Sequence, residues 1–356
     1  MSGICSKAAG HTSVSRRPPP TWPRRCKEPA SRASITTPIM LASWWSCERR
    51  WERGPQIDDA SVQECDSRLT KRKEALVVAD IADRFQQDGC VHPIEVLSEA
   101  EAGTYAKRMQ HDLADLASED NFADWNYYKP YLIFEWFYEL ATSRRLLDTV
   151  EQVVGPDVVL WGGSISNKPP HSSGFFSWHQ DEKYWHLEPQ GRAVVAWLAL
   201  STVDEQNGCL KYLPGTHRKG EVAHEMTYHP DNYLRRGQQI VDATQLDEAV
   251  SIVLRPGEMS LHHGLVIHGS GPNESSRPRL GVNITYLPPE VRAPGARESA
   301  ILVRGEDRFG NYAAETPARG SASSEARLEH QRAMAGITRR TLSTAGKRAA
   351  YDGARS

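Results

Sequence analysis

The sequence predicts a mainly β fold, a sheet sandwich or barrel that carries flanking helices on one side. After Gly155-Pro156 the chain consists of short β-branched or aliphatic runs separated by Gly, Pro and Asn, which is typical of strands and turns. Before that point apolar residues recur at helical spacing. The phosphate-binding patterns GxGxxG and GxxxxGKS/T, typical of doubly wound α/β folds, are absent from the sequence. The strands expected from these runs are 158–165, 193–200, 209–213, 250–254 and 280–287.

The first 60 residues lack the pattern of a folded segment. Prolines at 18–20 and 23 interrupt any helix, and seven Lys or Arg precede Met40 against the single acid Glu28. Disorder is expected, and an organellar transit peptide or a start codon placed too early would give the same composition. We therefore divide the chain into an extension (1–70), disordered or mis-assigned, a folded domain (71–295) and a partly helical or disordered appendage (296–356).

Helical spacing of apolar residues begins near residue 76 and continues to Phe85, where Asp88-Gly89 provides a stop. A strand is expected at 91–96. Ser98 and Glu101 then form a capping box for a helix that runs to about Ala117. Residues 133–154 are expected to be helical again, with core-packing aromatic residues at 134, 136 and 137. After Ala296 an exposed helix is expected near 324–335.

Composition excludes several classes of partner. The 43 Lys and Arg nearly balance 45 Asp and Glu, so no basic field exists to hold nucleic acid or an anionic membrane. No run of about 18 apolar residues occurs, so no membrane span is expected. Six cysteines without a CxxC pair fit a reducing compartment and no zinc ribbon. We expect a cytoplasmic monomer or homodimer that acts on a small molecule, with organellar targeting as the alternative.

Three side chains have the chemistry of a metal site. In an extended strand the side chains of His179 and Asp181 point to the same face. His268 follows the apolar run Leu265 to Ile267, at an expected strand end that faces a cavity. Two imidazoles and one carboxylate on one face of an octahedral ion leave the other positions open, an arrangement that marks non-heme Fe(II) oxygenases. The adjacent residues 262 and 263 are rival ligands, ranked lower because only one of two neighbouring strand residues faces inward.

Arg279, at the start of the expected strand 280–287, is the fourth candidate. An arginine inside a β-barrel is costly unless an anion meets it, and a dicarboxylate co-substrate would supply that anion in bidentate fashion. Alone, Arg279 would equally well be a surface residue beside Arg277.

Several sequence blocks, in this order, resemble the phytanoyl-CoA dioxygenase family of Fe(II)/2-oxoglutarate oxygenases over residues 76–292. The blocks are Asn167-Lys168-Pro169-Pro170, Trp178-His179-Gln180-Asp181, Ala196-Trp197-Leu198-Ala199-Leu200, Asn207-Gly208-Cys209-Leu210, Leu213-Pro214-Gly215-Thr216-His217 and Ile267-His268-Gly269-Ser270, with Asn273 and Arg279. The resemblance implies a double-stranded β-helix (a cupin-like jelly roll).

The resemblance also assigns roles. It implies catalytic iron ligands at His179, Asp181 and His268, and binding of 2-oxoglutarate by Arg279 with Ser270 and Trp197 in support. It implies Fe(II), 2-oxoglutarate and O2 as cofactor and co-substrates, with release of succinate and CO2. Since halogenases of this superfamily replace the carboxylate ligand with a small residue, Asp181 favours a hydroxylase. His217 belongs to a turn block of the family and is expected to be structural or to lie at the entrance.

Two alternatives and two smaller questions remain at this point. The alternatives are a non-catalytic jelly-roll binding protein and a Zn- or Mn-dependent isomerase or hydrolase on the same triad. Aromatic residues around the HxD segment either line a substrate pocket or pack in the core. The triplet Asn283-Ile284-Thr285 matches a glycosylation acceptor, which we attribute to chance in the absence of a secretory signal. The aromatic residues are Phe175, Phe176, Trp178, Tyr184 and Trp185.

Overall fold

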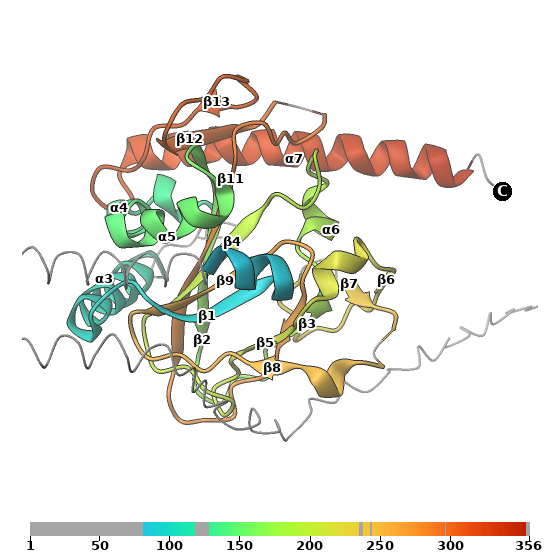
Figure 1. Ribbon diagram of the computed structural model, residues 1–356. Coiled ribbons are helices and arrows are strands. Elements are labelled where there is room, and N and C mark those ends of the chain that lie inside the picture. The colour runs from blue at the N-terminus through green and yellow to red at the C-terminus, as the bar shows by residue number, and fades with distance from the viewer. Residues whose placement is uncertain (1–80, 118–127, 235–237, 243, 296, 354–356) are drawn as a thin grey trace, which may run out of the picture.

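The fold consists of mainly antiparallel sheets flanked by helices (Figure 1). It was obtained as a computed structural model, and the structure describes residues 81–117, 128–234, 238–242, 244–295 and 297–353. The extension expected at 1–70 and the first apolar positions of the expected helix lie outside these residues. The strands are β1 Cys90–Glu95, β2 Val158–Lys168, β3 Phe176–His179, β4 Val194–Ala199, β5 Leu210–Leu213, β6 His224–Met226, β7 Gln238–Ile240, β8 Val250–Ser251, β9 Glu258–His263, β10 Ile267–Ser270, β11 Arg279–Leu287, β12 Ser299–Arg304 and β13 Ala313–Ala314.

The strands form a large and a small sheet plus a hairpin. The seven-stranded sheet has the order β1-β9-β4-β11-β2-β12-β13, the four-stranded sheet has the order β3-β10-β5-β8, and β6 pairs with β7. The helices are α3 Glu99–Ala117, α4 Glu135–Ala141, α5 Arg144–Val154, α6 Glu182–Trp185 and α7 Ser324–Gly353, with short 3-10 turns at Pro130–Leu132, Thr216–Lys219 and Leu246–Glu248. This is the mainly β jelly-roll architecture that the sequence predicts.

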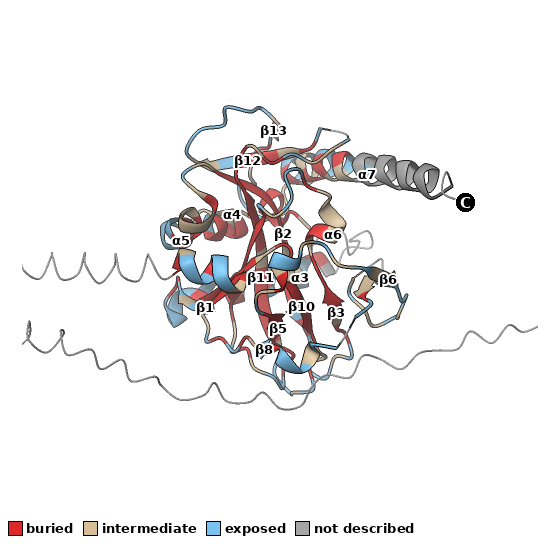
Figure 2. Ribbon diagram, turned by 45° about the vertical axis from the view of Figure 1, so that its right-hand side comes forward, coloured by how far each residue is buried: buried red, intermediate tan, exposed pale blue. Residues whose placement is uncertain are grey.

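Alternation along the central strands separates the two faces of the large sheet. On β11 the even-numbered residues from Leu280 to Tyr286 join the core cluster that also contains residues of α3, α4 and α5. On β4, Leu198 faces the same helices, whereas Trp197 packs with Tyr212 of the small sheet. Because side chains alternate with a period of two, the odd-numbered residues of β11 face the small sheet. Figure 2 shows the strands between the layers as buried and the loops and outer helix surfaces as exposed.

The helical elements follow local signals. The Ser98 hydroxyl accepts from the backbone N–H of Glu101 at 3.3 Å, and the Glu101 carboxylate accepts from the backbone N–H of Ser98 at 2.7 Å, so the predicted capping box starts α3. Residues 133–154, expected to be one helical region, form α4 and α5 with a break at Thr142 and Ser143. None of the described helices is both long enough and apolar enough to cross a bilayer.

Two segments differ from the sequence expectation. The strand expected at Leu265 to Ile267 begins only at Ile267, because Val266 donates its backbone N–H to His263 O at 2.9 Å and closes a turn. His268 is therefore the second residue of β10 and does not end a strand. Residues after 296, expected to be an appendage, include β12, which pairs with β2 of the large sheet and buries Ala300 and Ile301. Helix α7 extends well beyond the expected 324–335.

A buried ion pair holds this C-terminal segment in place. Lys129 Nζ donates to Glu315 Oε1 at 2.6 Å, and both side chains are about 1% exposed. Tyr131 donates its hydroxyl to Glu315 Oε2 at 3.0 Å, and Lys129 also donates to the Ser299 carbonyl at 2.6 Å. A buried pair with these extra hydrogen bonds ties the segment just before α4 to β12 and to the residues that follow β12.

Loss of this pair should destabilise the fold. Glu315→Gln leaves the Lys129 ammonium buried without a counter-charge, so we expect the free energy of unfolding to fall by about 3 kcal/mol. Glu306→Gln is the matched control, because Glu306 pairs with Arg308 on the surface, where such a pair contributes at most about 1 kcal/mol. Urea denaturation of both variants measures the difference, and equal losses would contradict the anchoring role.

Candidate active site between the two sheets

Three of the predicted residues meet at one point. His179 ends β3 and lies directly opposite His268 on β10, so the strand register sets the two imidazoles side by side with ring centroids 4.2 Å apart. Asp181 Oδ1 lies 3.3 Å from His179 Nε2 and 3.7 Å from His268 Nε2. One donor atom from each residue lies within 4.8 Å of the others, which is a geometry that one metal ion can bridge.

Asp181 reaches this point by a different route from the one expected. The sequence argument placed His179 and Asp181 on one face of an extended strand, but β3 ends at His179 and Asp181 has helical dihedral angles (φ −61°, ψ −43°) as the N-cap of α6. The chain turns at Gln180, whose side chain is fully buried and donates to the carbonyls of Gly220 and Leu265. A strand-to-helix turn, and not strand alternation, brings the carboxylate to the imidazoles.

His262 lies beside the triad but on the far side of the carboxylate. Its Nε2 is 3.2 Å from Asp181 Oδ2, whereas His179 and His268 lie near the other carboxylate oxygen, Oδ1. The Nδ1 atom of His262 is 3.0 Å from the Tyr212 hydroxyl. Tyr212 in turn lies 2.8 Å from the Ser260 hydroxyl. With the proton on Nε2, His262 donates to Asp181 and accepts from Tyr212, so it orients the carboxylate.

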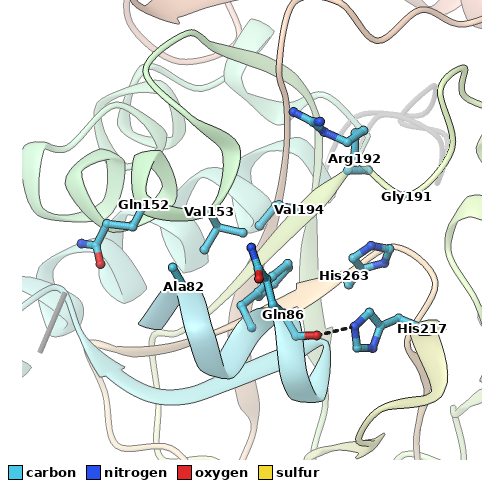
Figure 3. A pocket seen from close by; sticks show the side chains of 11 residues that line it. Ala82, Gln86, Gln152, Val153, Gly191, Arg192, Val194, His217 and His263 are labelled. Atoms are coloured by element: carbon cyan, nitrogen blue, oxygen red, sulfur yellow. Dashed lines mark hydrogen bonds between the residues drawn. The ribbon is translucent and has the colours of Figure 1, made fainter. Parts of the chain in front are cut away.

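His263, the other rival, lies on the opposite face of β9. It lines a separate cavity of about 350 Å³ together with His217, and the two rings lie 5.0 Å apart (Figure 3). His217 Nε2 donates to the Gln86 carbonyl at 3.1 Å. The expectation that only one of residues 262 and 263 faces inward is confirmed, and His217 lies away from the triad.

The pKa shifts of Asp181 and His268 favour the protonation states that bind a cation. Burial opposes ionisation of Asp181, but the neighbouring rings of His268, His179 and His262 outweigh it and hold the pKa of that carboxyl well below its usual value. Burial, together with His179, lowers the pKa of His268 to about 3. At neutral pH the site therefore offers an ionised carboxylate and a neutral imidazole lone pair, which are the protonation states that metal ligands require.

Arg279 is fully buried and has no carboxylate within ion-pair distance among the described residues. One terminal nitrogen donates to the Ser270 hydroxyl at 2.9 Å and the other to the Ser166 hydroxyl at 2.8 Å, while Nε has no hydrogen-bond partner in the described chain. The guanidinium lies 5.3 Å from the Trp197 ring centroid. Burial lowers the pKa of Arg279 to about 10, which leaves it charged at neutral pH.

A second buried basic side chain, which the sequence analysis did not single out, lies beside Arg279. Lys168 Nζ donates to the Ser270 hydroxyl at 2.6 Å and to the Gly271 carbonyl. Burial and the neighbouring Arg279 lower the pKa of Lys168 well below its ordinary value. Two basic groups that share one serine and face only neutral acceptors among the described residues form a site that an anion would stabilise.

A cavity of about 190 Å³ between the sheets contains the triad. Of the aromatic residues near the HxD segment, Phe176 and Trp185 line it, whereas Trp178 packs in a small apolar cluster. Phe175 packs against His229 with ring centroids 5.1 Å apart, and Tyr184 lies edge-on to His179. The lining residues are Tyr128, Gly163, Ser164, Ile165, Ser166, Phe176, His179, Asp181, Trp185, Trp197, Leu210, Leu234, His262, His268, Asn283 and Thr285.

Sequence reasoning missed the polar wall of this cavity. Asn283 and Thr285, noted only as a chance glycosylation match, lie on the cavity face of β11, and Thr285 is only 3% exposed. The period of two counted from Arg279 would have identified both, since residues 279, 281, 283 and 285 share one face. Tyr212 and the orienting role of His262 depend on cross-strand register and carry no local sequence signal.

Comparison with known proteins gives concordant matches. The family model described as phytanoyl-CoA dioxygenase (PhyH) matches residues 85–281. The peroxisomal phytanoyl-CoA dioxygenase of Bos taurus is 32% identical over 155 residues, which are 43% of this chain and 46% of the relative, so the chain spans about half the length of this relative. An ectoine dioxygenase of Streptomyces avermitilis is 27% identical over 234 residues, 59% of this chain and 78% of the relative. The solved apo structure of the non-heme monooxygenase ThoJ superimposes with a TM-score of 0.68 at 28% identity, covering 75% of this chain and 99% of its own.

The acid next to the triad should make stability depend on pH. Burial raises the pKa of Glu182 to about 7, so its favourable contribution is complete below its unfolded-state pKa of 4.5 and is lost as pH rises through 7. Glu182→Gln removes this ionisation and retains an oxygen for the Gly191 N–H. Relative to wild type, we expect the metal-free variant to gain up to about 3 kcal/mol of unfolding free energy between pH 5 and pH 8.5.

Denaturant titrations of both proteins at the two pH values measure this gain. A stability difference that does not change with pH would contradict the role given to Glu182.

Proposed function

Because the chain belongs to the phytanoyl-CoA dioxygenase family of Fe(II)- and 2-oxoglutarate-dependent oxygenases, we propose that it oxidises a small molecule with 2-oxoglutarate and O2 as co-substrates, releasing succinate and CO2. One observation carries this proposal: His179, Asp181 and His268 converge in a cavity near the buried Arg279, which has no carboxylate partner among the described residues. A metal site alone would fit an isomerase or hydrolase, but such a reaction would leave the buried guanidinium without a function.

The donor set fits ferrous iron. His179 and His268 would each give Nε2, and Asp181 would give Oδ1, while His262 holds the other carboxylate oxygen. Two imidazoles and one carboxylate, without a thiolate, are the ligands of oxygen-activating iron and differ from those of a closed structural zinc site. When bound, Fe(II) supplies the oxidising chemistry that couples decarboxylation of 2-oxoglutarate to oxidation of the substrate.

The basic pocket fits the far carboxylate of 2-oxoglutarate. Arg279 has an unused Nε–H, and Lys168 shares Ser270 with it, so an anion there meets a guanidinium and a second basic group in a buried setting. Charge-assisted hydrogen bonds of this kind are stronger than neutral ones. Trp197 lies against the guanidinium and limits the space available to the bound acid.

The remaining details of the proposal concern reaction type and setting. An intact carboxylate at Asp181 leaves no vacancy for a halide, which supports hydroxylation over halogenation. Cys90 and Cys209 are buried free thiols, which supports a reducing compartment such as the cytoplasm. We propose that the protein works there as a monomer or homodimer on a small-molecule substrate, without nucleic-acid or membrane partners.

The co-substrate site can be tested by optical titration. Anaerobic protein with Fe(II) should develop a weak visible absorption band as 2-oxoglutarate is added. Arg279→Ala should raise the dissociation constant for 2-oxoglutarate about tenfold or more, since it removes a buried charged partner. Arg277→Ala is the matched control, because Arg277 lies two residues away in a partly exposed pair with Asp204. A band that is absent from the wild type, or unchanged in Arg279→Ala, rejects the proposal, and a succinate-release screen with His179→Ala as blank then identifies substrates.

Metal affinity tests the orienting role of His262 separately. His262→Leu removes the hydrogen bond to Asp181 Oδ2, and loss of such a contact weakens metal binding by about tenfold to a hundredfold. The control His263→Leu changes the adjacent residue on the opposite face of β9 and should leave the affinity unchanged. Calorimetric titration with Mn(II), which needs no turnover, gives both values. Equal affinities in the two variants would assign His262 to packing alone.

A further inference from the structure

The cavity wall opposite the metal ligands is polar, and its polar groups are unused. Ser164 on β2 and Asn283 on β11 are direct cross-strand partners, and Thr285 follows Asn283 on the same face. No hydrogen bond joins any of these three side chains to another group of the described chain; Thr285 is 3% exposed, whereas Ser164 and Asn283 are half-buried and line the cavity. Polar side chains that line a cavity and have no partner in the chain are available to a ligand, so three neighbouring ones on one wall point to a ligand that forms hydrogen bonds.

The charge of the lining restricts that ligand. Among the described residues that line the cavity, the only Asp, Glu, Lys or Arg is Asp181, which belongs to the triad. The nearby cations Lys168 and Arg279 are fully buried and do not line the cavity. A charged substrate group placed against Ser164, Asn283 and Thr285 would lose water without gaining a counter-charge.

An apolar substrate fits equally poorly. A plain alkyl chain against this wall would leave all three polar groups without water and without a partner, at a cost of about tenfold in affinity for each. Sites built to hydrogen-bond a hydroxyl or amide discriminate strongly against analogues that lack it. Phe176 and Trp185 also line the cavity and provide flat apolar surfaces for the remainder of the molecule.

We infer that the substrate presents uncharged hydroxyl or amide groups to the wall formed by Ser164, Asn283 and Thr285, with an apolar or ring-bearing portion against Phe176 and Trp185. This inference rests on the proposed function, because the wall faces the metal ligands. It assigns Asn283 and Thr285 to substrate recognition and separates this protein's substrate from a simple branched acyl chain.

A matched set of five benzene derivatives tests the inference. The protein is loaded with Ni(II) and 2-oxoglutarate, which blocks turnover and occupies Arg279, and benzamide, benzyl alcohol, benzoate, benzylamine and toluene are titrated by ligand-observed NMR. Benzamide and benzyl alcohol should bind at least about tenfold more tightly than the charged and apolar members, as hydrogen-bond pairing requires.

Two near-isosteric variants locate the effect. The double variant Asn283→Leu/Thr285→Val should lose about tenfold or more in benzamide affinity and gain affinity for toluene. Thr338→Val on the exposed face of α7 is the control and should change neither. The 2-oxoglutarate titration that precedes each probe shows that the variant is folded and loaded.

The outcomes separate the two proposals. Toluene, benzoate or benzylamine binding as tightly as benzamide, unchanged benzamide affinity in the double variant, or no binding of any probe by loaded wild type each overturn the inference and leave the oxygenase proposal intact. Wild type that fails to bind 2-oxoglutarate overturns both.

Discussion

The buried guanidinium of Arg279 is the constraint around which the interior between the sheets is arranged. A charge without a counter-ion in a protein interior is costly, and among the described residues the hydrogen-bond acceptors around Arg279 are two serine hydroxyls and the Gly208 carbonyl, with the Trp197 ring beside them. The same β11 face continues through Gly281, where a Cβ atom would meet the Trp197 ring at 2.6 Å. Glycine at that position lets the indole lie against the arginine. A ligand of opposite charge that binds the folded state would add to its stability, so binding and stability are linked in this layer.

Alternation of side chains along the strands lets the same strand contribute to the core on one face and to the cavity on the other. Leu280, Val282 and Ile284 pack against the helices, and the residues between them face the cavity, so one strand serves both the core and the site. The same rule separates His262 from His263, which are adjacent in sequence yet line different cavities. A shift of one residue in the register of β9 would exchange the positions of these two imidazoles. It would remove the contact of His262 with Asp181 and that of His263 with His217.

Residue chemistry and local pattern predict much of this arrangement. The strands around 158, 194, 210 and 280, the capping box at Ser98 and the residues of the metal-binding cluster are all accessible from sequence. The features that could not be predicted from the sequence depend on contacts between segments that are far apart in the chain. The turn that redirects Asp181 relies on Gln180 bonding to carbonyls 40 and 85 residues away, and Lys168 gains its environment from a strand a hundred residues later. Residues 299–304 contain the short aliphatic run Ala300-Ile301-Leu302-Val303, which the sequence analysis did not assign as a strand, and the structure pairs this segment with β2.

The place of β12 in the large sheet also bears on how the chain can be shortened. This strand covers the edge of β2, and β13 covers only two residues of β12 in turn. A recombinant fragment that stops near residue 295, where the family resemblance ends, would retain every metal-binding residue but expose an eleven-residue strand with unpaired backbone groups along part of its length. Exposed edges of that kind recruit strands from other molecules, so such a fragment would be lost to aggregation before its chemistry was impaired.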